Sequence, residues 1–281
     1  MLKTVKFVAS HPMNRHRKVA SIFGYLKWQI ISRAQSEHVF NWIEDSQLVV
    51  ANGMTGATGN IYCGLHEFND KAFFLHVLRE DDTFLDIGAN VGSYSVLAGK
   101  VCGSKIIAFE PDEGTASSYE RNMSANDISD YDLHRVALGP QDGSISFTIG
   151  LDTVNRVSDR DDLPTHKVPM KKLDDIPNAT SATFIKMDVE GFEAKVLEGA
   201  EKVLNSPSLI ALQTECDDPA VETILNQSGL FRYYYNAEDR TLTLEPDDGN
   251  KAANALFIKD KATVEARIAS APYRSFRGKE F

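Results

Sequence analysis

The sequence predicts an α/β protein built on a mostly parallel sheet with helices on both faces, and three observations carry this prediction. From residue 83 onward, short apolar runs alternate with helical stretches, which is typical of repeated strand–helix–strand units. The 281 residues, 42% apolar and 25% charged, are enough to bury a large core. A glycine-rich turn follows the first apolar run, and the ends of parallel strands are where such sheets hold ligands.

The segment before this series has a mixed pattern. Residues 1–47 combine helical and irregular stretches, and we expect residues 1–75 to form a cover or a dimerisation segment, which makes a homodimer one expected assembly. Residues 47–65 contain β-branched residues interrupted by glycines, which predicts a hairpin or a loop cover. Residues 69–79 show the apolar spacing of a helix.

The main domain is expected over residues 76–281. Its strands and helices alternate as "TFLDIG" then "SYSVLAGKV", "KIIAFE" then "TASSYERNMSAN", "YDLHRVALG", "ATFIKMD" then "FEAKVLEGAEKVL", and "LIALQTE" then "AVETILNQSG". Two later runs, "RYYYN" and "NALFIKD", are candidates for an antiparallel edge. An insertion at about residues 143–175, with β segments in "SISFTIG" and "HKVPMKKL", is expected near the carboxyl edge of the sheet, where it would shape the substrate site.

Charge and cysteine content exclude several classes of function. Thirty Lys and Arg against forty Asp and Glu give a formal charge of −10, so we expect no nucleic-acid partner. Cys63, Cys102 and Cys216 are far apart and lack C-x-x-C spacing, which argues against a disulfide framework or a zinc site. A reducing compartment, the cytoplasm, fits this cysteine usage best.

The amino-terminal region lacks the apolar run and cleavage site of a secretory signal. Residues 19–31 are apolar but include Lys27 and are too short to span a bilayer, so we expect no transmembrane segment. Together with "NRHRK" at residues 14–18, they have the composition of a helix that lies on an anionic membrane. A helix packed on the domain with a solvated basic end is the favoured alternative.

The first strand of the series ends in "DIGANVG", which places Asp86 before Gly88, Asn90 and Gly92. Gly88 and Gly92 permit a tight turn with close approach of a ligand, and the following helix offers free N–H groups. The dinucleotide fingerprint G-x-G-x-x-G is absent, because position 90 is asparagine. Asp86 would repel a pyrophosphate but attract an ammonium group.

The second strand ends at Glu110, followed by Pro111. An acidic residue about 20 positions after such a turn is placed to accept hydrogen bonds from both hydroxyls of a ribose. A ligand with a ribose and an ammonium group, and without a need for pyrophosphate, is S-adenosylmethionine. We therefore predict this cofactor.

Several of these segments together resemble the FkbM-type S-adenosylmethionine-dependent methyltransferases. The resemblance rests on "DIGANVGSYSVLA", "AFEPD", "VALG", "LDD" and above all "IKMDVEGFEAKVLEGA", and covers roughly residues 60–215. It implies a class I methyltransferase fold, Rossmann-like, with a seven-stranded sheet whose last strand is antiparallel. It also implies O-methylation of a hydroxyl on a saccharide, glycoconjugate or related natural product. The expected cofactor-binding residues are Asp86, Gly88, Asn90, Gly92, Glu110, Pro111 and Ala137.

The fourth strand ends at Asp188, which in class I methyltransferases faces the methyl group. We predict that Asp188 binds or deprotonates the acceptor and that Glu190 is the second catalytic candidate. No dense ligand motif accompanies them, so we predict no metal, although Glu215 could join them around a divalent cation. Glu193 is expected to favour the positive end of the next helix.

The sequence offers two further candidate site residues and two alternative functions. His66 is a candidate base, more often a packing residue, and Glu67 could reach the amino-acid end of the cofactor. A nicotinamide-dependent oxidoreductase on a similar sheet is one alternative function, which Asp86 disfavours. A non-catalytic nucleoside-binding module is another, to be distinguished by whether Asp188 and Glu190 face an open pocket.

Overall fold

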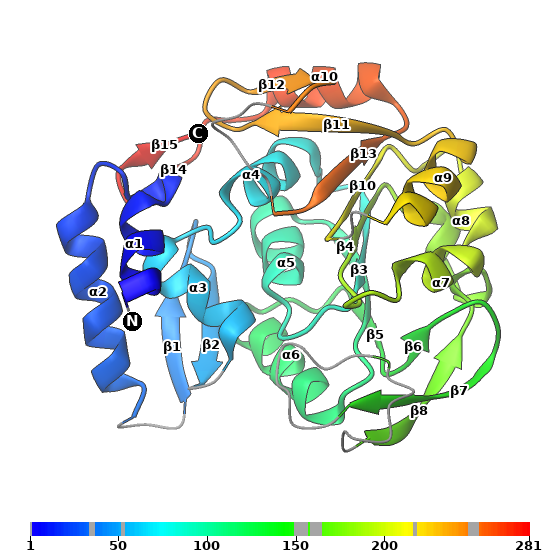
Figure 1. Ribbon diagram of the computed structural model, residues 1–281, viewed down its shortest axis with the longest axis horizontal. Helices are drawn as coiled ribbons and strands as arrows, with labels where there is room; N and C mark the ends of the chain where they lie inside the picture. The colour runs from blue at the N-terminus through cyan, green and yellow to red at the C-terminus, as the bar shows by residue number, and fades with distance from the viewer. Residues whose placement is uncertain are drawn as a thin grey trace.

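The computed structural model describes residues 2–33, 37–51, 54–148, 157, 165–215, 218–246 and 253–281. Its central sheet contains β3 (Thr83–Ile87), β4 (Lys105–Phe109), β5 (Tyr131–His134), β9 (Phe184–Met187), β10 (Ala211–Thr214), β11 (Phe231–Asn236), β12 (Thr241–Thr243) and β13 (Ala255–Ile258). These strands lie in the order β12-β11-β13-β10-β9-β3-β4-β5 (Figure 1).

Most of this sheet is parallel, as predicted. Strands β5, β4, β3, β9 and β10 pair in parallel, whereas β13 is antiparallel to both of its neighbours, β10 and β11. These seven strands confirm the predicted sheet and its antiparallel last strand. The short strand β12 adds an eighth at the edge, and β13 lies inside the sheet rather than at its edge.

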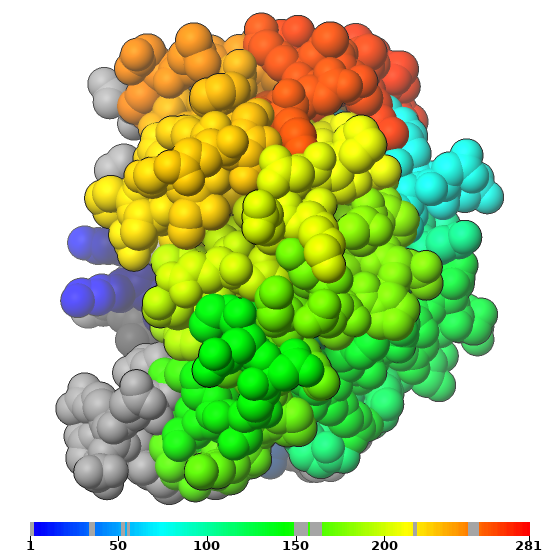
Figure 2. Space-filling model, turned by 90° about the vertical axis from the view of Figure 1, so that its right-hand side faces the viewer, coloured from blue at the N-terminus to red at the C-terminus, as the bar shows by residue number. Residues whose placement is uncertain are grey.

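Helices cover both faces of the sheet (Figure 1). One face carries α4 (Phe68–Val77), α5 (Ser93–Val96), a π-helical turn η2 (Leu97–Cys102), α6 (Glu113–Ala125) and α10 (Lys261–Ser270), and the other carries α7 (Glu193–Glu198), α8 (Glu201–Asn205) and α9 (Pro219–Gln227). Figure 2 shows the molecule from the side of α7, α8 and α9. Successive strand residues alternate between the two cores: Phe84 packs toward α4, and Leu85 toward α7.

Aspartates begin three of these helices. Asp112, Asp218 and Asp260 each accept a hydrogen bond from a backbone N–H in the first turn of α6, α9 and α10, respectively. Such caps satisfy donors that a helix start would otherwise leave unpaired. The cap at Asp112 matters for the site, because it fixes the chain immediately after Glu110.

The amino-terminal part consists of α1 (Leu2–Ser10), η1 (Pro12–Asn14), α2 (Lys18–Ile31), β1 (Glu37–Asn41), β2 (Gln47–Ala51) and α3 (Thr55–Cys63). The prediction of a hairpin or loop over residues 47–65 was wrong for α3, which is helical, while β2 forms its hairpin with the earlier strand β1. Gly59 allows α3 to pack closely, since a Cβ there would lie 2.6 Å from the His66 ring.

Two asparagines, one in α6 and one immediately after its last residue, attach this hairpin to the main domain. The side-chain oxygens of Asn122 and Asn126 accept hydrogen bonds from the backbone N–H groups of Val49 and Gln47, at 2.6 and 2.7 Å. Leu48 of β2 also belongs to the same buried cluster as the strand residues that face α4. The amino-terminal part therefore shares a core with one face of the sheet.

The insertion forms a small sheet of its own, as predicted for its two β segments. Strand β8 (Thr165–Lys171) pairs antiparallel with β7 (Gly143–Thr148) and parallel with β6 (Ala137–Leu138). Short 3-10 helices, η4 (Leu173–Asp175) and η5 (Ala179–Ser181), lead from it to β9, and the hairpin β14 (Ser275–Phe276) and β15 (Lys279–Glu280) closes the chain. Within the described residues, no helix is both long and apolar enough to cross a bilayer.

Candidate active site

The site lies where the order of the sheet reverses. Strand β3 lies between β4 and β9. After β3, the chain first adds β4 and β5 on one side of it and later adds β9 and β10 on the other side. The loops after these strands diverge at this point and leave a cleft at the carboxyl edge. Two adjoining pockets occupy it, and both are lined by Gly88, Asn90 and Asp188.

The first pocket, called the apolar pocket below, extends toward the insertion. Its lining includes Ile87, Phe109, Glu110, Pro111, Ala137, Leu138, Phe147 and Glu190. The second, the charged pocket, extends toward α4. Its lining includes Glu67, Lys71, Asp86, Tyr94 and Lys186. The predicted cofactor and catalytic residues thus lie around one cleft, apart from Gly92, which lines neither pocket.

The turn after β3 depends on its glycines for different reasons. Gly88 has a φ of +75°, and a Cβ there would lie 1.9 Å from the carbonyl oxygen of Asp188. Only glycine allows β3 and β9 to end so close together. Gly92 has a φ of +84°, and a Cβ there would meet the Tyr119 ring at 2.7 Å, so its role is packing against α6.

Glu110 is held in place by the backbone around it. Its two carboxyl oxygens accept hydrogen bonds from the N–H groups of Asn90 and Asp112, at 3.0 and 2.9 Å. Burial raises the pKa of Glu110 to about 7, although these two bonds act in the opposite direction. Because each carboxylate oxygen can accept more than one bond, the group still has acceptor capacity toward the apolar pocket.

Asp86 is more enclosed than Glu110 and is held by a side chain. The Ser95 hydroxyl of α5 donates to one of its carboxyl oxygens at 2.6 Å. Burial raises the pKa of Asp86 to about 6, and the Ser95 bond and the Lys186 charge oppose this. The carboxyl group forms part of the wall of the charged pocket, where an ammonium group of a ligand would favour its ionised form.

A network of charges that the sequence analysis missed fills the charged pocket. Lys71 forms an ion pair with Glu67 at 2.7 Å, and the Tyr94 hydroxyl donates to the same Glu67 oxygen at 2.8 Å. Lys186 lies 3.4 Å from a carboxyl oxygen of Asp188. Burial opposes the charge on Glu67, but Lys71 and Lys186 outweigh it and hold the pKa of Glu67 well below its usual range.

One signal could have revealed this network. Lys186 is the lone charge in the otherwise apolar strand "FIKM" and is 2% exposed. A buried lysine requires an anionic partner, because an isolated charge is costly in the protein interior. Its partners, Asp188 and Glu67, come from the strand end and from the residue that precedes α4.

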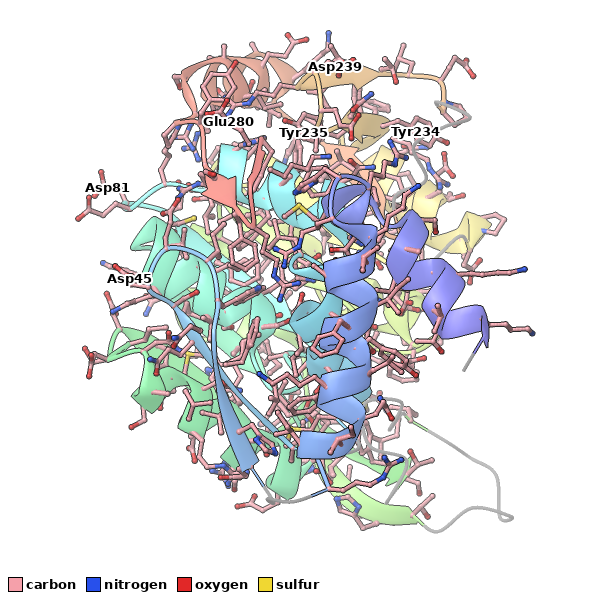
Figure 3. All side chains as sticks on the ribbon, turned by 90° about the vertical axis from the view of Figure 1, so that its left-hand side faces the viewer. Asp45, Asp81, Tyr234, Tyr235, Asp239 and Glu280 are labelled. Atoms are coloured by element: carbon pink, nitrogen blue, oxygen red, sulfur yellow. The ribbon has the colours of Figure 1, made fainter. Side chains whose placement is uncertain are left out.

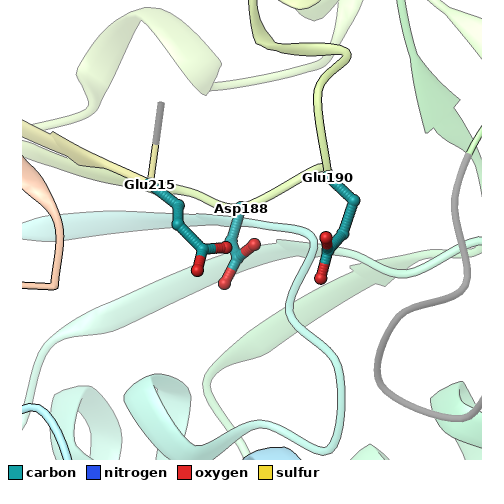
Figure 4. A group of neighbouring side chains, drawn as sticks. All are labelled: Asp188, Glu190 and Glu215. Carbon is teal, nitrogen blue, oxygen red and sulfur yellow. The ribbon is translucent and has the colours of Figure 1, made fainter. Parts of the chain in front are cut away.

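Three carboxylates converge at the ends of β9 and β10 (Figure 4). An oxygen of each of Asp188, Glu190 and Glu215 lies within 4.8 Å of the others. Glu190 has a φ of +53°, an uncommon value for a residue other than glycine. Burial, and then the neighbouring Asp188, raise the pKa of Glu215 above its usual range. This arrangement favours one proton shared between Asp188 and Glu215, and it is also compatible with a divalent cation.

Glu193 has a structural role, as expected. It is 2% exposed, and one of its carboxyl oxygens accepts hydrogen bonds from the N–H groups of Val189 and Gly191, at 3.3 and 3.2 Å. These bonds fix the loop between β9 and α7. The side chain thereby helps to hold the strained turn at Glu190.

A further cavity adjoins Glu215 on the side of the amino-terminal helices. It encloses about 350 Å³ and is lined by Phe7, Ser10, His11, Pro12, His66, Glu67, Phe68, Asn69, Asp70, Glu215 and Ala253. The His11 ring donates from Nε2 to the His66 carbonyl at 2.7 Å, and burial lowers the pKa of His11 to about 4. Burial lowers the pKa of His66 as well, so both imidazoles are neutral at pH 7.

The residues at the cleft fit S-adenosylmethionine. The apolar pocket combines apolar walls for a purine with Glu110 for ribose hydroxyls. The charged pocket offers carboxylates for an ammonium group and lysines for a carboxylate. Gly88 keeps the floor between the two pockets free of a side chain.

Comparison with known proteins supports the same assignment. The "Methyltransferase FkbM domain" model matches residues 86–229. Methyltransferase 1 of Beauveria bassiana is 29% identical over 160 residues, which cover 48% of this chain and 64% of that protein. Hexuronic acid methyltransferase AglP of Haloferax volcanii is 26% identical over 163 residues, covering 56% of this chain and 66% of that protein. The chain thus spans just under two thirds of each relative's length.

Among solved structures, M. jannaschii TYW2 in complex with AdoMet is 12% identical and has a TM-score of 0.43, over 80% of this chain and 88% of that one. The family match sets aside the nicotinamide-dependent oxidoreductase, since the family is one of methyltransferases. The chain belongs to the FkbM methyltransferase family, and its cofactor is S-adenosylmethionine.

Proposed function

We propose that this protein transfers a methyl group from S-adenosylmethionine to a hydroxyl of a saccharide, a glycoconjugate or a related natural product. The observation that carries this proposal is the position of Asp188. Its carboxylate lines the cofactor cleft and also lies beside Glu215, which lines the next cavity. A base at this junction can reach both the acceptor and the cleft.

In this proposal, each residue of the cleft has a definite task. The bound cofactor supplies an electrophilic methyl group on a sulfonium. Glu110 holds the ribose hydroxyls, and the charged pocket holds the amino-acid end. Asp188 would accept the proton that the acceptor hydroxyl loses as its oxygen bonds to the methyl carbon, while the bond from that carbon to sulfur breaks and the cofactor leaves as a neutral thioether. Lys186 places a positive charge beside this carboxylate, 3.4 Å from one of its oxygens.

The acceptor is proposed to occupy the cavity beside Glu215. This cavity combines hydrogen-bonding groups, among them His11, His66 and Asn69, with the aromatic rings of Phe7 and Phe68. Polar groups around an apolar surface suit a sugar ring, which has hydroxyl edges and apolar C–H faces. The relative named as a hexuronic acid methyltransferase supports a saccharide as the acceptor.

The amino-terminal part then has the role of a cover. Helix α1 contributes Phe7 and Ser10 to the acceptor cavity, which supports a cover role for the part of residues 1–75 that precedes α4, with the methyltransferase domain proposed over residues 76–281. The cysteine spacing supports a reducing compartment, the cytoplasm, as its location.

The alternative of a non-catalytic nucleoside-binding module makes a different prediction about the carboxylates. Asp188 and Glu190 both line the apolar pocket and are partly exposed, as a reacting group must be. The test is incubation with S-adenosylmethionine labelled in its methyl group and a panel of glycans, followed by location of the label. Transfer to a sugar oxygen, lost in Asp188→Asn, would support the proposal. Cofactor binding without transfer to any acceptor would favour the binding module.

A further inference from the structure

Helix α2 has two apolar faces, and the protein covers only one of them. Ser21, Tyr25 and Trp28 are buried against the domain. On the opposite side, Val19, Phe23, Leu26 and Ile30 are 83, 70, 43 and 73% exposed. Their spacing of four, three and four residues aligns them along one stripe of the helix. A solvated helix normally places polar residues there, so this stripe points to a binding surface.

The segment that carries the stripe is basic. The first 36 residues contain seven Lys and Arg and no Asp or Glu, whereas the rest of the chain carries 23 Lys and Arg against all 40 Asp and Glu. Lys3, Lys6, Lys18 and Lys27 are exposed. The charge of this region is therefore opposite in sign to that of the rest of the molecule.

The stripe is accessible as well as apolar. In Figure 3, α2 runs across the face of the molecule with α1 beside it, and it lies nearest to the viewer. In Figure 1, the same helix forms the outer edge of the amino-terminal part. A flat surface could therefore meet the stripe without any change in the fold.

We propose that the exposed stripe of α2 docks on an anionic lipid surface. Large apolar side chains flanked by lysines are the features by which a helix lies at the headgroup level of a membrane with negative charge. This inference goes beyond the methyl-transfer activity and does not depend on it.

A second copy of the chain fits the surface less well. A two-fold dimer would bring one basic region against another, so that like charges face each other. A head-to-tail contact with the acidic remainder of another copy would leave a free stripe at one end and a free acidic surface at the other, and would lead to open chains. An anionic lipid surface is apolar and negative at once and meets neither difficulty.

The test is flotation of the full chain with vesicles of phosphatidylcholine alone and with vesicles that also contain phosphatidylglycerol. The expected result is binding to the anionic vesicles, weaker by about tenfold or more with neutral vesicles or at high salt. The variant Phe23→Ser/Ile30→Ser should lose this binding. The matched control Leu244→Ser alters an apolar residue that is 67% exposed and lies elsewhere, and should bind like the unaltered chain.

Because the altered side chains are exposed, the variants should keep the unfolding temperature of the unaltered chain, which thermal melting checks. Failure of the unaltered chain to float with anionic vesicles would overturn the proposal. Equal flotation of Phe23→Ser/Ile30→Ser would overturn it too. A dimer in light scattering that this variant converts to a monomer would assign the stripe to a second copy instead.

Discussion

The two pockets of the cleft share the turn after β3, but backbone groups position the acidic side chain in one, and other side chains position the charged residues in the other. In the apolar pocket, the carboxylate of Glu110 is fixed by two backbone N–H groups. The charged pocket contains Asp86, Glu67, Lys71 and Lys186, which are held by side-chain contacts: Lys71 pairs with Glu67, Ser95 donates to Asp86, and Lys186 pairs with Asp188. Backbone contacts form with the fold and resist substitution, whereas a charge network loses its balance when one member changes. The charged pocket should therefore be the more sensitive of the two to mutation.

The largest effect is expected from Asp188→Asn, at the junction of the two pockets. An amide cannot accept the proton of the acceptor, so the rate of methyl transfer should fall by about 10²–10⁴-fold. Affinity for S-adenosylmethionine should change little, and calorimetry together with a radiolabel assay would measure both. Glu198→Gln, an exposed carboxylate on α7, is the matched control. Equal turnover by Asp188→Asn would remove this residue from the mechanism.

Gly88→Ala tests the floor shared by both pockets. The new Cβ would lie 1.9 Å from the Asp188 carbonyl oxygen, and the φ of +75° is unfavourable for alanine. Relief of this clash must separate β3 from β9, so we expect a loss of stability of about 2–4 kcal/mol and loss of cofactor binding. Chemical denaturation measures the loss of stability, and titration calorimetry measures the loss of cofactor binding. Gly24→Ala, with nothing within 4 Å of the new Cβ, should be tolerated, and equal tolerance at Gly88 would contradict the described turn.

Glu110→Ala tests the apolar pocket alone. Loss of charge-assisted hydrogen bonds to ribose hydroxyls should weaken binding of S-adenosylmethionine by about 1–3 kcal/mol. The charged pocket should still bind the amino-acid end of the cofactor, since Glu110 does not line that pocket. Titration calorimetry of the unaltered protein and of Glu110→Ala measures the two affinities for S-adenosylmethionine. Equal affinities would show that Glu110 does not bind the ribose.

The smallest effect is expected from Glu215→Gln, which should alter the pH dependence. The pKa of Glu215 is raised, so at pH values below it the Asp188–Glu215 pair holds a proton and is a poorer base. The rate should therefore rise as the pH increases through this pKa. Because Glu215→Gln removes a negative charge beside Asp188, the rise in the methyl-transfer rate should occur at lower pH in this variant. Near neutral pH, the rate should change by about tenfold at most. A kcat profile that is identical in the variant would show that the pair does not control the proton.

The sequence predicted those parts of the site that lie along the chain. Asp86, Gly88 and Asn90 adjoin one strand end, Glu110 adjoins the next, and parallel strands place such ends at one edge. The electrostatic interaction of Lys186 with Glu67 was not predictable in this way, because it depends on how α4 and the residue before it lie on the sheet. The surroundings of Gly92 were not predictable from its spacing either. The spacing predicted a cofactor contact, whereas in the structure Gly92 lies against the ring of Tyr119.

The most direct test of the central claim is a structure of the protein with S-adenosylhomocysteine bound. We expect the ribose hydroxyls on the carboxylate of Glu110, the adenine in the apolar pocket, the amino-acid end in the charged pocket and the sulfur facing Asp188. A ligand bound away from the β3–β9 junction, or bound there with Glu110 making no contact with the ribose, would contradict this account.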